Sequence, residues 1–551
     1  MRDFAQIQQT KYDVIIIGGG INGAGVARDA ALRGLKTILV EKNDFASGSS
    51  SWSSRLIHGG LRYLEYFEFP LVRESLKERE VLLRTAPHLV KPLQLTIPIY
   101  GDRSRPYWKI WAGMILYDLF SFDKTLPVHR MLPKAKFKQL FPSLDQENLT
   151  GGSQYYDGQV TRAERLCLEN IIAAQNAGAT ALNYAEVTEL AIADSQINHL
   201  VCKDKLTGES FKIFGSSDAV VVNTAGPWID QVCQQGNKAG QKFPIGSTKK
   251  NGGTKGSHII VEQFPGAPGC TLYVEAKSDG RPFFIIPWLD KYLIGTTDLP
   301  YKDDIENIKA DNSEIDYLLQ ETNNIIPTAN LGRDDIKFTY SGVRPLPNSE
   351  GKKPGSITRK HIIFDHRSEG IDNLLTLIGG KLTTYRNVGE EIVNEIFKRT
   401  KRSQKPCQTD SLPLPGCIFP TDQRIQQAIT EYSSIAVKTI DHLFSVYGVQ
   451  ALSVLALTKE NPDLSQLLSP NLSDIKAQVV YAVANESAHT LVDILRRRTT
   501  LAMNGDYGIN LLPVVTATLK HHCGWTSEQC DRACADYRFY MEHNCIPEYQ
   551  L

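Results

Sequence analysis

Short apolar runs that end at glycine recur along the chain, and each has the length of a buried strand. Val14–Ile17 leads into "GGGING", Val220–Pro227 reads "VVVNTAGP", and Leu375–Arg386 reads "LTLIGGKLTTYR". Between the first run and a second strand predicted at Thr37–Val40, residues Asn22–Leu32 have helical spacing with many small side chains. Continuous apolar strands alternating with helices are typical of a parallel sheet that is covered on both faces. The pattern therefore predicts an α/β region built from β-α-β units.

The pattern changes near residue 400. Thr400–Asp422 contains several prolines and many polar residues, which indicates a linker. Helical spacing then dominates, over the ranges Gln423–Tyr447, Ser473–Met503, Leu511–His522 and Thr526–His543. We therefore expect a large α/β region over residues 12–400, a linker over 401–422 and a C-terminal α-helical domain over 423–551.

Length, charge and cysteine content narrow the class of protein. At 551 residues the chain is too long for one hydrophobic core and should form two or three domains. The formal net charge is zero, so no overall field attracts nucleic acid, and any membrane or anion binding must come from a local patch. The ten cysteines form no CxxC pair, which favours a reducing compartment. We expect no signal peptide and no apolar run of about 18 residues that spans a bilayer, and so place folding in the cytosol.

The first glycine turn has the signature of a nucleotide site. Gly18, Gly20 and Gly23 form GxGxxG between strand and helix, and Glu41 closes the second strand. Such glycines allow close approach of the backbone to a pyrophosphate, whose charge faces the helix N-terminus, while the acid binds ribose hydroxyls. An ordinary glycine-rich turn is the alternative, but the strand, helix, strand and acid in register favour a dinucleotide.

The remaining turns favour FAD over NAD. An NAD domain usually continues with regular β-α repeats, whereas here Glu41 is followed by Ala46–Leu64, "ASGSSSWSSRLIHGGLRYL". Three strand-to-glycine turns spread over the chain suit one extended cofactor. The helix predicted after the third turn can direct partial positive charge at an anionic ring edge.

Several longer stretches resemble the FAD-dependent glycerol-3-phosphate dehydrogenases, a respiratory, membrane-associated family of D-amino-acid-oxidase-like flavoproteins. They are "IIIGGGINGAGVARDAALRGL", "SSRLIHGGLRYLEYFEFPLVRESLKEREVLLRTAPHL", "NTAGPW", "KGSHIIV", "IPWLDKYLIGTTD", "TYSGVRPL", "SITRKH" and "GGKLTTYR". They follow the family's order over roughly residues 12–400, and a weaker resemblance continues to the C-terminus. The resemblance implies a Rossmann-like FAD-binding domain interleaved with an antiparallel-sheet (α+β) substrate domain. The implied FAD-binding segments lie near 12–80, 150–235 and 365–400, and the substrate and membrane-facing segments near 81–149 and 236–364.

The resemblance also implies that FAD lies along the glycine turns and the serine-rich loop. Small hydroxyls can donate hydrogen bonds to its phosphates without blocking the backbone, although a plain polar loop is the alternative interpretation. The implied cofactor-binding residues are Gly18, Gly20, Asn22, Gly23, Glu41, Lys42, Ser47, Ser50, Ser51, Ser54, Gly59, Gly60, Val187, Ala225, Gly226, Gly380, Lys381, Leu382 and Thr383.

The implied substrate, sn-glycerol 3-phosphate, is a dianion that requires cations. Arginine suits bidentate phosphate contacts and lysine a point-charge contact. One or two of the cations in the family motifs can instead form structural ion pairs. The implied substrate-binding residues are Arg62, Tyr63, Arg344, Arg359 and Lys381.

The implied reaction needs a hydride acceptor and a base. Hydride leaves C2 of the alcohol for FAD, which yields dihydroxyacetone phosphate, while a base takes the hydroxyl proton. We expect His58 to be that base because histidine titrates near working pH, with a lysine or a strongly perturbed arginine as the rival. Arg344, Lys381 and Lys255 complete the predicted catalytic set, since cations stabilise a developing alkoxide. Lys255 and its neighbour His258 can equally be strand residues satisfied in the wall.

The resemblance implies that the electrons pass on to ubiquinone or menaquinone. Asp102–Phe122, "DRSRPYWKIWAGMILYDLFSF", mixes aromatic, aliphatic and basic residues, which favours an interfacial helix and hence the quinone. A surface helix packed on its own domain is the alternative for this stretch. The resemblance implies monotopic attachment to the cytoplasmic face of the inner membrane, and it leaves a homodimer open. The rival functions are an oxidase that makes H2O2 from O2, and a flavin-bearing membrane-binding protein without activity, against which the intact cation set argues.

Two features of the C-terminal domain have no expected role in the chemistry. Arg496–Arg498 should form salt bridges to the main body. The spacings of the following residues match no standard zinc site, so we expect no metal: His521, His522, Cys523, Cys530, Cys534, His543 and Cys545.

Overall fold

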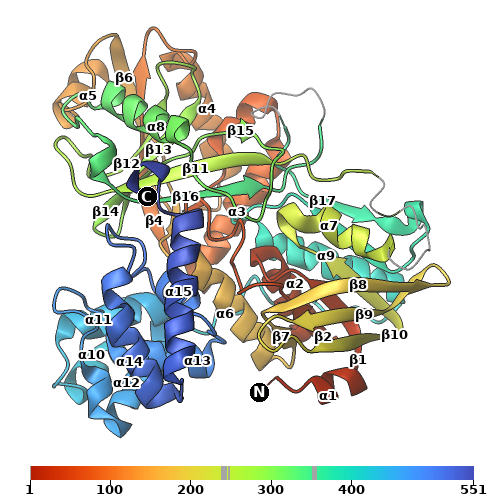
Figure 1. Ribbon diagram of the computed structural model, residues 1–551. Helices are drawn as coiled ribbons and strands as arrows, with labels where there is room; N and C mark the ends of the chain where they lie inside the picture. The colour runs from red at the N-terminus through yellow and green to blue at the C-terminus, as the bar shows by residue number, and fades with distance from the viewer. Residues whose placement is uncertain (1, 238–244, 246–247, 350–356) are drawn as a thin grey trace.

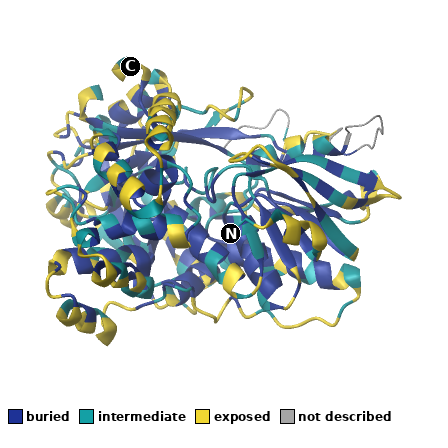
Figure 2. Ribbon diagram, turned by 60° about the horizontal axis from the view of Figure 1, so that its bottom comes forward, coloured by how far each residue is buried: buried dark blue, intermediate teal, exposed yellow. Residues whose placement is uncertain are grey.

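Two β-sheets and a helical C-terminal domain make up the protein (Figure 1). The structure is a computed structural model that describes residues 2–237, 245, 248–349 and 357–551. Strands of both sheets are mostly buried, whereas exposed residues gather on loops and on the outer faces of helices (Figure 2). The predicted fold class is confirmed: an α/β domain, an interleaved antiparallel sheet and a helical C-terminal domain.

The first sheet has a parallel core in the order β18-β10-β1-β2-β7. All of β2 and most of β1 are buried, as expected for apolar strands covered on both faces. Antiparallel β17 extends one edge, and the β8–β9 hairpin pairs with β10. The strands are β1 Lys11–Ile17, β2 Thr37–Val40, β7 Thr180–Leu182, β8 Ala185–Ala193, β9 Gln196–Asp204, β10 Ser210–Asn223, β17 Ile362–Asp365 and β18 Leu374–Ile378.

Helices α2, α6 and α9 share one buried hydrophobic cluster with this sheet. A Cβ at Gly389 of α9 would lie 2.9 Å from the backbone of Gly25 in α2, so glycine at both positions lets the two helices approach closely. The small residues of the first predicted helix therefore serve helix packing. The helices of this domain are α1 Phe4–Gln9, α2 Ile21–Leu32, α6 Ala163–Asn176, α7 Ile229–Gln234 and α9 Tyr385–Thr400.

The second sheet has ten strands within the described residues, in the order β15-β11-β14-β13-β12-β4-β6-β3, with β16 beside β11 and β5 beside β6. Its neighbouring strands are antiparallel, apart from the parallel pair β4–β12. The strands are β3 Leu56–Ile57, β4 Val90–Tyr100, β5 Arg130–Pro133, β6 Leu149–Val160, β11 Thr254–Val261, β12 Thr271–Glu275, β13 Pro282–Trp288, β14 Lys291–Gly295, β15 Leu299–Pro300 and β16 Ile336–Arg344. The accompanying helices are α3 Phe69–Thr85, α4 Tyr107–Phe120, α5 Lys134–Leu140 and α8 Asn312–Ile325.

One predicted boundary, the start of the FAD-binding segment near residue 150, differs from the structure. β4 and β6 form a single ladder from Val90 opposite Val160 to Tyr100 opposite Leu149. Residues 150–160 therefore belong to the second sheet, although the FAD-binding segment was predicted to begin near 150. The pairing of β6 with β4 joins strands that are far apart in the chain, so the sequence could not show it. The boundary was therefore predicted at the start of β6.

The C-terminal domain is helical, as predicted, but its helices are shorter. The range 423–447 divides into α10 and α11, and 473–503 divides into α13 and a π-helical turn at Asp493–Arg498. Helix α12 was not predicted as a separate element. The bounds are α10 Gln423–Glu431, α11 Val437–Tyr447, α12 Ala451–Glu460, α13 Lys476–Asn485, α14 Leu512–Cys523 and α15 Ser527–Asn544.

One segment among the described residues, Val437–Glu460, is long and apolar enough by composition to cross a membrane. Half of its most apolar window is buried inside the protein, and it bends at Gly448, whose φ is +57°. Its side chains form much of the hydrophobic cluster of the C-terminal domain. We therefore interpret it as a pair of core helices.

The C-terminal domain is fastened to the rest by buried ion pairs. Arg496 pairs with Glu164 at 2.6 Å, and Arg497 and Arg498 both pair with Asp44 at 2.6 Å, which confirms the predicted salt bridges. The segment predicted as a linker, 401–422, also packs on the main body. The carbonyl of Leu412, for example, accepts a hydrogen bond from Arg28 on α2.

Candidate cofactor and substrate site

One large cavity lies where the parallel strands β1 and β10 end and the second sheet begins. Its volume is about 1200 Å³, which exceeds the space that a drug-sized ligand requires. Three chain segments that are distant in sequence line it: the first glycine turn, the turn after β10, and the turn after β18. These are the turns that the apolar pattern predicted to share one cofactor.

The start of α2 faces this cavity. Gly20 is the N-cap residue of α2 and has no side chain to satisfy the helix N-terminus, so the hydroxyl of Ser50 accepts from the N–H of Ile21 at 2.9 Å. The Oδ1 atom of Asn22 is buried without a hydrogen-bond partner among the described residues. Backbone N–H groups at a helix N-terminus and an unpaired polar atom suit a bound pyrophosphate.

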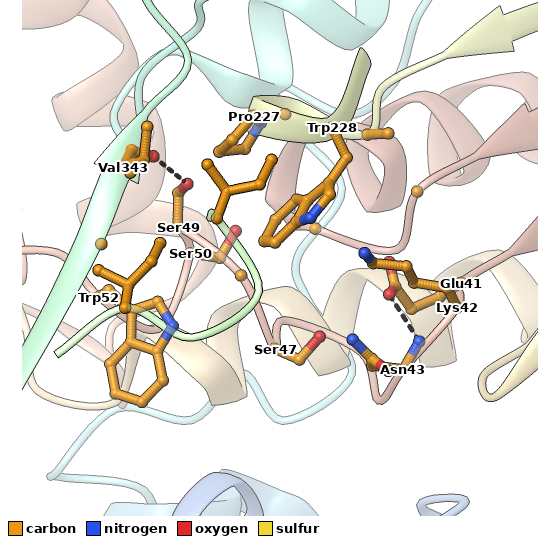
Figure 3. A pocket seen from close by; sticks show the side chains of 18 of the residues that line it. Glu41, Lys42, Asn43, Ser47, Ser49, Ser50, Trp52, Pro227, Trp228 and Val343 are labelled. Carbon is orange, nitrogen blue, oxygen red and sulfur yellow. Dashed lines mark hydrogen bonds between the residues drawn. The ribbon is translucent and has the colours of Figure 1, made fainter. Parts of the chain in front are cut away.

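Glu41 lies at the end of β2, where the predicted ribose-binding acid belongs. Its two carboxylate oxygens accept from the N–H groups of Gly19 at 2.7 Å and Asn43 at 2.9 Å. Figure 3 shows Glu41 and Asn43 beside the serine-rich loop, with Lys42 close to Trp228. Burial raises the pKa of Glu41. The backbone contacts therefore fix the carboxylate at the cavity wall.

Hydroxyl groups of the serine-rich loop hold it in place. Ser49 donates to the carbonyl of Val343 at 2.8 Å, which ties the loop to β16 (Figure 3). Ser54 shares a hydrogen bond of 2.8 Å with the ring of His258. Ser51 donates to the carbonyl of Ala46 at 2.6 Å and does not line the cavity, so its role is to close the loop.

The third turn brings Gly380, Lys381, Leu382 and Thr383 to the cavity wall. A Cβ at Gly380, whose φ is +93°, would lie 2.7 Å from the side-chain nitrogen of Asn22. A side chain is therefore excluded where the first and third turns meet. Thr383 accepts a hydrogen bond of 3.2 Å from the N–H of His58, which joins this turn to the substrate side.

His58 is partly buried at the cavity wall, edge-on to Phe284 with 6.3 Å between ring centroids. Burial, and then the charge of Lys381, lower the pKa of His58 to about 3. The imidazole is therefore neutral at physiological pH and carries a lone pair that can accept a proton.

Lys381 is held from two sides. Its ammonium donates to the hydroxyl of Ser75 on α3 at 2.8 Å and lies 4.6 Å from the ring centre of Tyr63. Burial lowers the pKa of Lys381 to about 8, despite the charges of Glu74 and Asp157. The group remains mostly cationic at pH 7.

Two arginines complete the cationic side of the cavity. Arg344 ends β16, and Arg359 precedes β17; both line the cavity. Burial lowers the pKa of Arg344, but a guanidinium stays charged at any working pH. Both arginines contact the carboxylate of Asp298, at 3.0 Å from Arg344 and 3.4 Å from Arg359.

The structure gathers most of the predicted site residues around one cavity. Those that line it are Gly18, Gly20, Asn22, Glu41, Lys42, Ser47, Ser50, Ser54, His58, Tyr63, Val187, Ala225, Gly226, Arg344, Arg359, Gly380, Lys381, Leu382 and Thr383. Those that do not line it are Gly23, Ser51, Gly59, Gly60, Arg62 and Lys255. Gly23 and Gly59 serve packing instead: a Cβ would lie 2.0 Å from the carbonyl oxygen of Gly18 and 2.5 Å from the hydroxyl of Tyr117, respectively.

Lys255 is the clearest departure from the predicted catalytic set. Its ammonium pairs with Glu314 at 2.7 Å and Asp311 at 3.4 Å, both on α8 or its N-cap. Adjacent residues of a strand point to opposite faces, and Gly256 and His258 are the residues of β11 that line the cavity. Lys255 therefore faces α8, which corrects its assignment as a catalytic cation.

Several residues at the cavity wall or next to it were not predicted. Trp228 follows the "NTAGP" turn, and its indole N–H donates to Glu306 at 2.6 Å, while Lys42 pairs with the same carboxylate at 2.5 Å. Asp298 lies in "IGTTD", one of the stretches that resemble the family, but a lone aspartate carries no chemical signal in the sequence. His258 was considered without commitment. It lines the cavity, and burial holds its pKa well below the usual range.

Two family models match the chain. One, described as FAD dependent oxidoreductase, matches residues 13–386, and the other, described as C-terminal domain of alpha-glycerophosphate oxidase, matches residues 407–530. The first covers more than half of the chain, which therefore belongs to the FAD-dependent oxidoreductase family. The prediction of FAD as the cofactor is confirmed, and the α2 N-terminus, Glu41 and the unpaired Asn22 oxygen fit it.

Individual relatives agree with the resemblance read from the motifs. The chain is 58% identical to glycerol-3-phosphate dehydrogenase from Synechocystis sp., over the full length of both proteins. It is 38% identical to D-erythritol 1-phosphate dehydrogenase from Brucella abortus, covering 88% of this chain and 94% of that one. Among solved structures, glycerol-3-phosphate dehydrogenase from Bacillus halodurans complexed with FAD matches with a TM-score of 0.77 and 28% identity, covering 98% of this chain and 96% of that one.

Proposed function

We propose that the chain is an FAD-dependent dehydrogenase that oxidises sn-glycerol 3-phosphate to dihydroxyacetone phosphate. The observation that carries this proposal is the placement of Lys381, Arg344 and Arg359 on the wall of the FAD cavity. Three cations in one cavity suit a phosphate dianion. Full-length identity of 58% to a glycerol-3-phosphate dehydrogenase supports this substrate.

The chain's own residues bind the substrate and move its proton. When bound, FAD supplies the acceptor for the hydride that leaves C2 of the alcohol. Lys381 and the two arginines hold the phosphate oxygens, and a ring nitrogen of His58 takes the hydroxyl proton. The alcohol thus loses one hydride and one proton and becomes a ketone.

His58 and Lys381 have different roles because their environments give them different pKa values. With a pKa lowered to about 3, His58 does not titrate near working pH as the sequence suggested: it is neutral and can accept a proton, but it is a weak base in the free enzyme. Lys381, with a pKa of about 8, stays charged at pH 7. Environments that separate two pKa values in this way assign acceptor and donor. A bound dianion raises both pKa values, which makes His58 a stronger base in the complex.

We further propose that the electrons pass to ubiquinone or menaquinone, and that the protein lies on the cytoplasmic face of the inner membrane. The support is the exposed apolar face of α4, where Trp108, Trp111 and Leu119 are 68%, 51% and 63% exposed. Phe122, just beyond α4, is 75% exposed. An exposed apolar surface of this kind supports a membrane or partner contact. The opposite face of α4, with Ile110, Met114 and Tyr117, packs on its own domain.

Two charges near α4 are paired within the protein. Arg105 pairs with Glu65 at 2.9 Å, and Lys109 pairs with the same carboxylate at 3.1 Å. Two of the basic residues in the stretch 102–122 are therefore already paired with a carboxylate. Apolar side chains should dominate attachment.

The electron acceptor can be tested on the purified holoenzyme. Glycerol 3-phosphate is supplied with either a soluble quinone or oxygen, and dihydroxyacetone phosphate and H2O2 are both measured. The proposal predicts faster ketone formation with the quinone and little H2O2. Stoichiometric H2O2 at an equal or higher rate with oxygen would identify an oxidase, and no ketone with either acceptor would refute the substrate assignment.

A further inference from the structure

The turn Gly295–Asp298 surrounds the guanidinium of Arg344. Arg344 donates to the hydroxyl of Thr296 at 3.0 Å, to the carbonyl of Thr297 at 3.2 Å, and to the carboxylate of Asp298 at 3.0 Å. A further bond, of 3.4 Å, reaches the hydroxyl of Thr254 on β11. Such a set of acceptors fixes both the position and the plane of the guanidinium.

Asp298 contacts a second arginine with its other oxygen. Oδ1 accepts from Arg344 and Oδ2 from Arg359 at 3.4 Å, so one carboxylate spans two cations that are fifteen residues apart in sequence. Both arginines line the cavity, but Asp298 does not. The carboxylate therefore contacts both guanidinium groups without itself forming part of the cavity wall.

The backbone of Asp298 is also held. Its carbonyl accepts from Arg281 at 3.0 Å, and the neighbouring hydroxyl of Thr297 donates to Glu314 of α8 at 2.6 Å. An acid that merely occupied the phosphate position until substrate arrived would need freedom to leave. The contacts of this turn instead keep Asp298 in place.

We propose that Asp298 is a positioning residue that sets the spacing and orientation of Arg344 and Arg359 for a phosphate, and so determines selectivity for phosphorylated over uncharged polyols. The inference rests on the proposed function. Arg344 and Arg359 touch the phosphate, whereas Asp298 acts only through them. Its loss should weaken phosphate recognition and leave the transfer of hydride at saturation nearly unchanged.

The test compares Asp298→Ala with Asp316→Ala in the FAD-loaded enzyme. Asp316 is a matched control, since it also receives two arginine bonds, from Arg333 at 2.8 and 2.7 Å, on the exposed side of α8. Asp298→Ala should raise KM for glycerol 3-phosphate about tenfold to a hundredfold, as expected for weakened charge-assisted hydrogen bonds, with kcat within about threefold of wild type. Inhibition by inorganic phosphate should weaken by a similar factor, and the slow rate with glycerol should not change.

Conservative variants separate this role from a structural one. Asp298→Glu, which keeps the charge, should recover part of the loss in KM, whereas Asp298→Asn should not. Tighter phosphate inhibition in Asp298→Asn would overturn the proposal, because it would mean that the acid competes with the ligand. Equal losses for glycerol and glycerol 3-phosphate would overturn it as well, since that pattern indicates general damage to the site.

The two proposals can fail separately. If wild type does not oxidise glycerol 3-phosphate, the proposed function is wrong. If wild type does so and Asp298→Ala keeps the wild-type KM and phosphate inhibition, only the role of Asp298 is wrong.

Discussion

Asp44 is the point at which the loop after Glu41 is joined to the C-terminal domain, and Asp44→Asn should loosen that junction. The carboxylate is fully buried and accepts four hydrogen bonds. Arg497 and Arg498 donate three of them, at 2.6, 2.6 and 2.8 Å, and Asn183 donates the fourth at 2.9 Å. Burial opposes ionisation, but the charges of Arg498 and Arg497 outweigh it and hold the pKa of Asp44 well below its usual range.

The size of the effect follows from what remains after the substitution. Asparagine keeps one acceptor oxygen, but its amide N–H groups must face the guanidinium of Arg498, which contacts both oxygens of Asp44. Removing one partner of a buried ion pair costs about 3–5 kcal/mol. Arg497 retains Asp493 at 2.5 Å, and Arg498 retains the carbonyl of Glu486 at 2.7 Å, so we expect the lower half of that range.

Hydrogen exchange of the amides in the turn Asp493–Arg498 measures this cost, because they are protected while the domain is docked. At about 1.4 kcal/mol per tenfold change, exchange should quicken by about a hundredfold or more in Asp44→Asn. Asp123→Asn is the control: its pair with Arg73 is partly exposed to solvent and worth at most about 1 kcal/mol. The reasoning is refuted if the two variants exchange alike.

The pH dependence gives an independent check on Asp44. A carboxyl with a depressed folded-state pKa contributes stability above its unfolded pKa of about 3.9 and loses it as the pH falls further. The difference between wild type and Asp44→Asn should therefore be constant from pH 5 to 8 and shrink only below about pH 4. A difference that shrinks near neutrality would point to another group.

Three further variants test the site and the membrane surface. The buried ammonium of Lys381 has a pKa of about 8, and its charged form binds phosphate, so kcat/KM should fall as the pH rises through about 8. Lys381→Arg should show no such decline. If the variant shows the same decline as wild type, the titrating group is not Lys381. His58→Ala should slow anaerobic flavin reduction about 10²- to 10⁴-fold with a smaller loss of affinity, and a wild-type rate at saturating substrate would show that His58 is not the base. Replacing Trp108, Trp111 and Leu116 by Ser should release the protein from membranes more completely than high salt does, since each large apolar residue contributes up to about 1.5–3 kcal/mol on full burial. This triple variant keeps Tyr117, which bonds the N–H of Gly59, so it should still reduce its flavin; sedimentation like wild type would refute attachment through α4.

The cofactor side of the cavity could be predicted because its signals are local. A tight glycine turn between a strand and a helix, and an acid at the end of the next strand, are each defined within a few residues. Glu41 and Gly20 therefore lie where the sequence places them. The later turns at Ala225 and Gly380 join them because parallel strands carry their ends to one edge of the sheet.

The polar contacts behind the site could not be predicted, because they depend on long-range packing. Nothing near Asp298 in sequence shows that its carboxylate bridges Arg344 and Arg359. For Lys255 the prediction was wrong. The residue lies in a stretch that resembles the family, but its side chain is on the face of β11 that is turned away from the cavity. Lys255 lies three residues before His258 on β11, and strand alternation turns the two side chains to opposite sides.

The anaerobic reduction of the bound flavin tests the central claim most directly. Purified holoenzyme is mixed without oxygen with glycerol 3-phosphate or with glycerol, and the visible absorbance of the flavin is followed. We predict rapid and complete bleaching by glycerol 3-phosphate and little by glycerol at the same concentration, because Lys381, Arg344 and Arg359 bind the phosphate. Equal bleaching by the two alcohols, or none by glycerol 3-phosphate, would contradict the account.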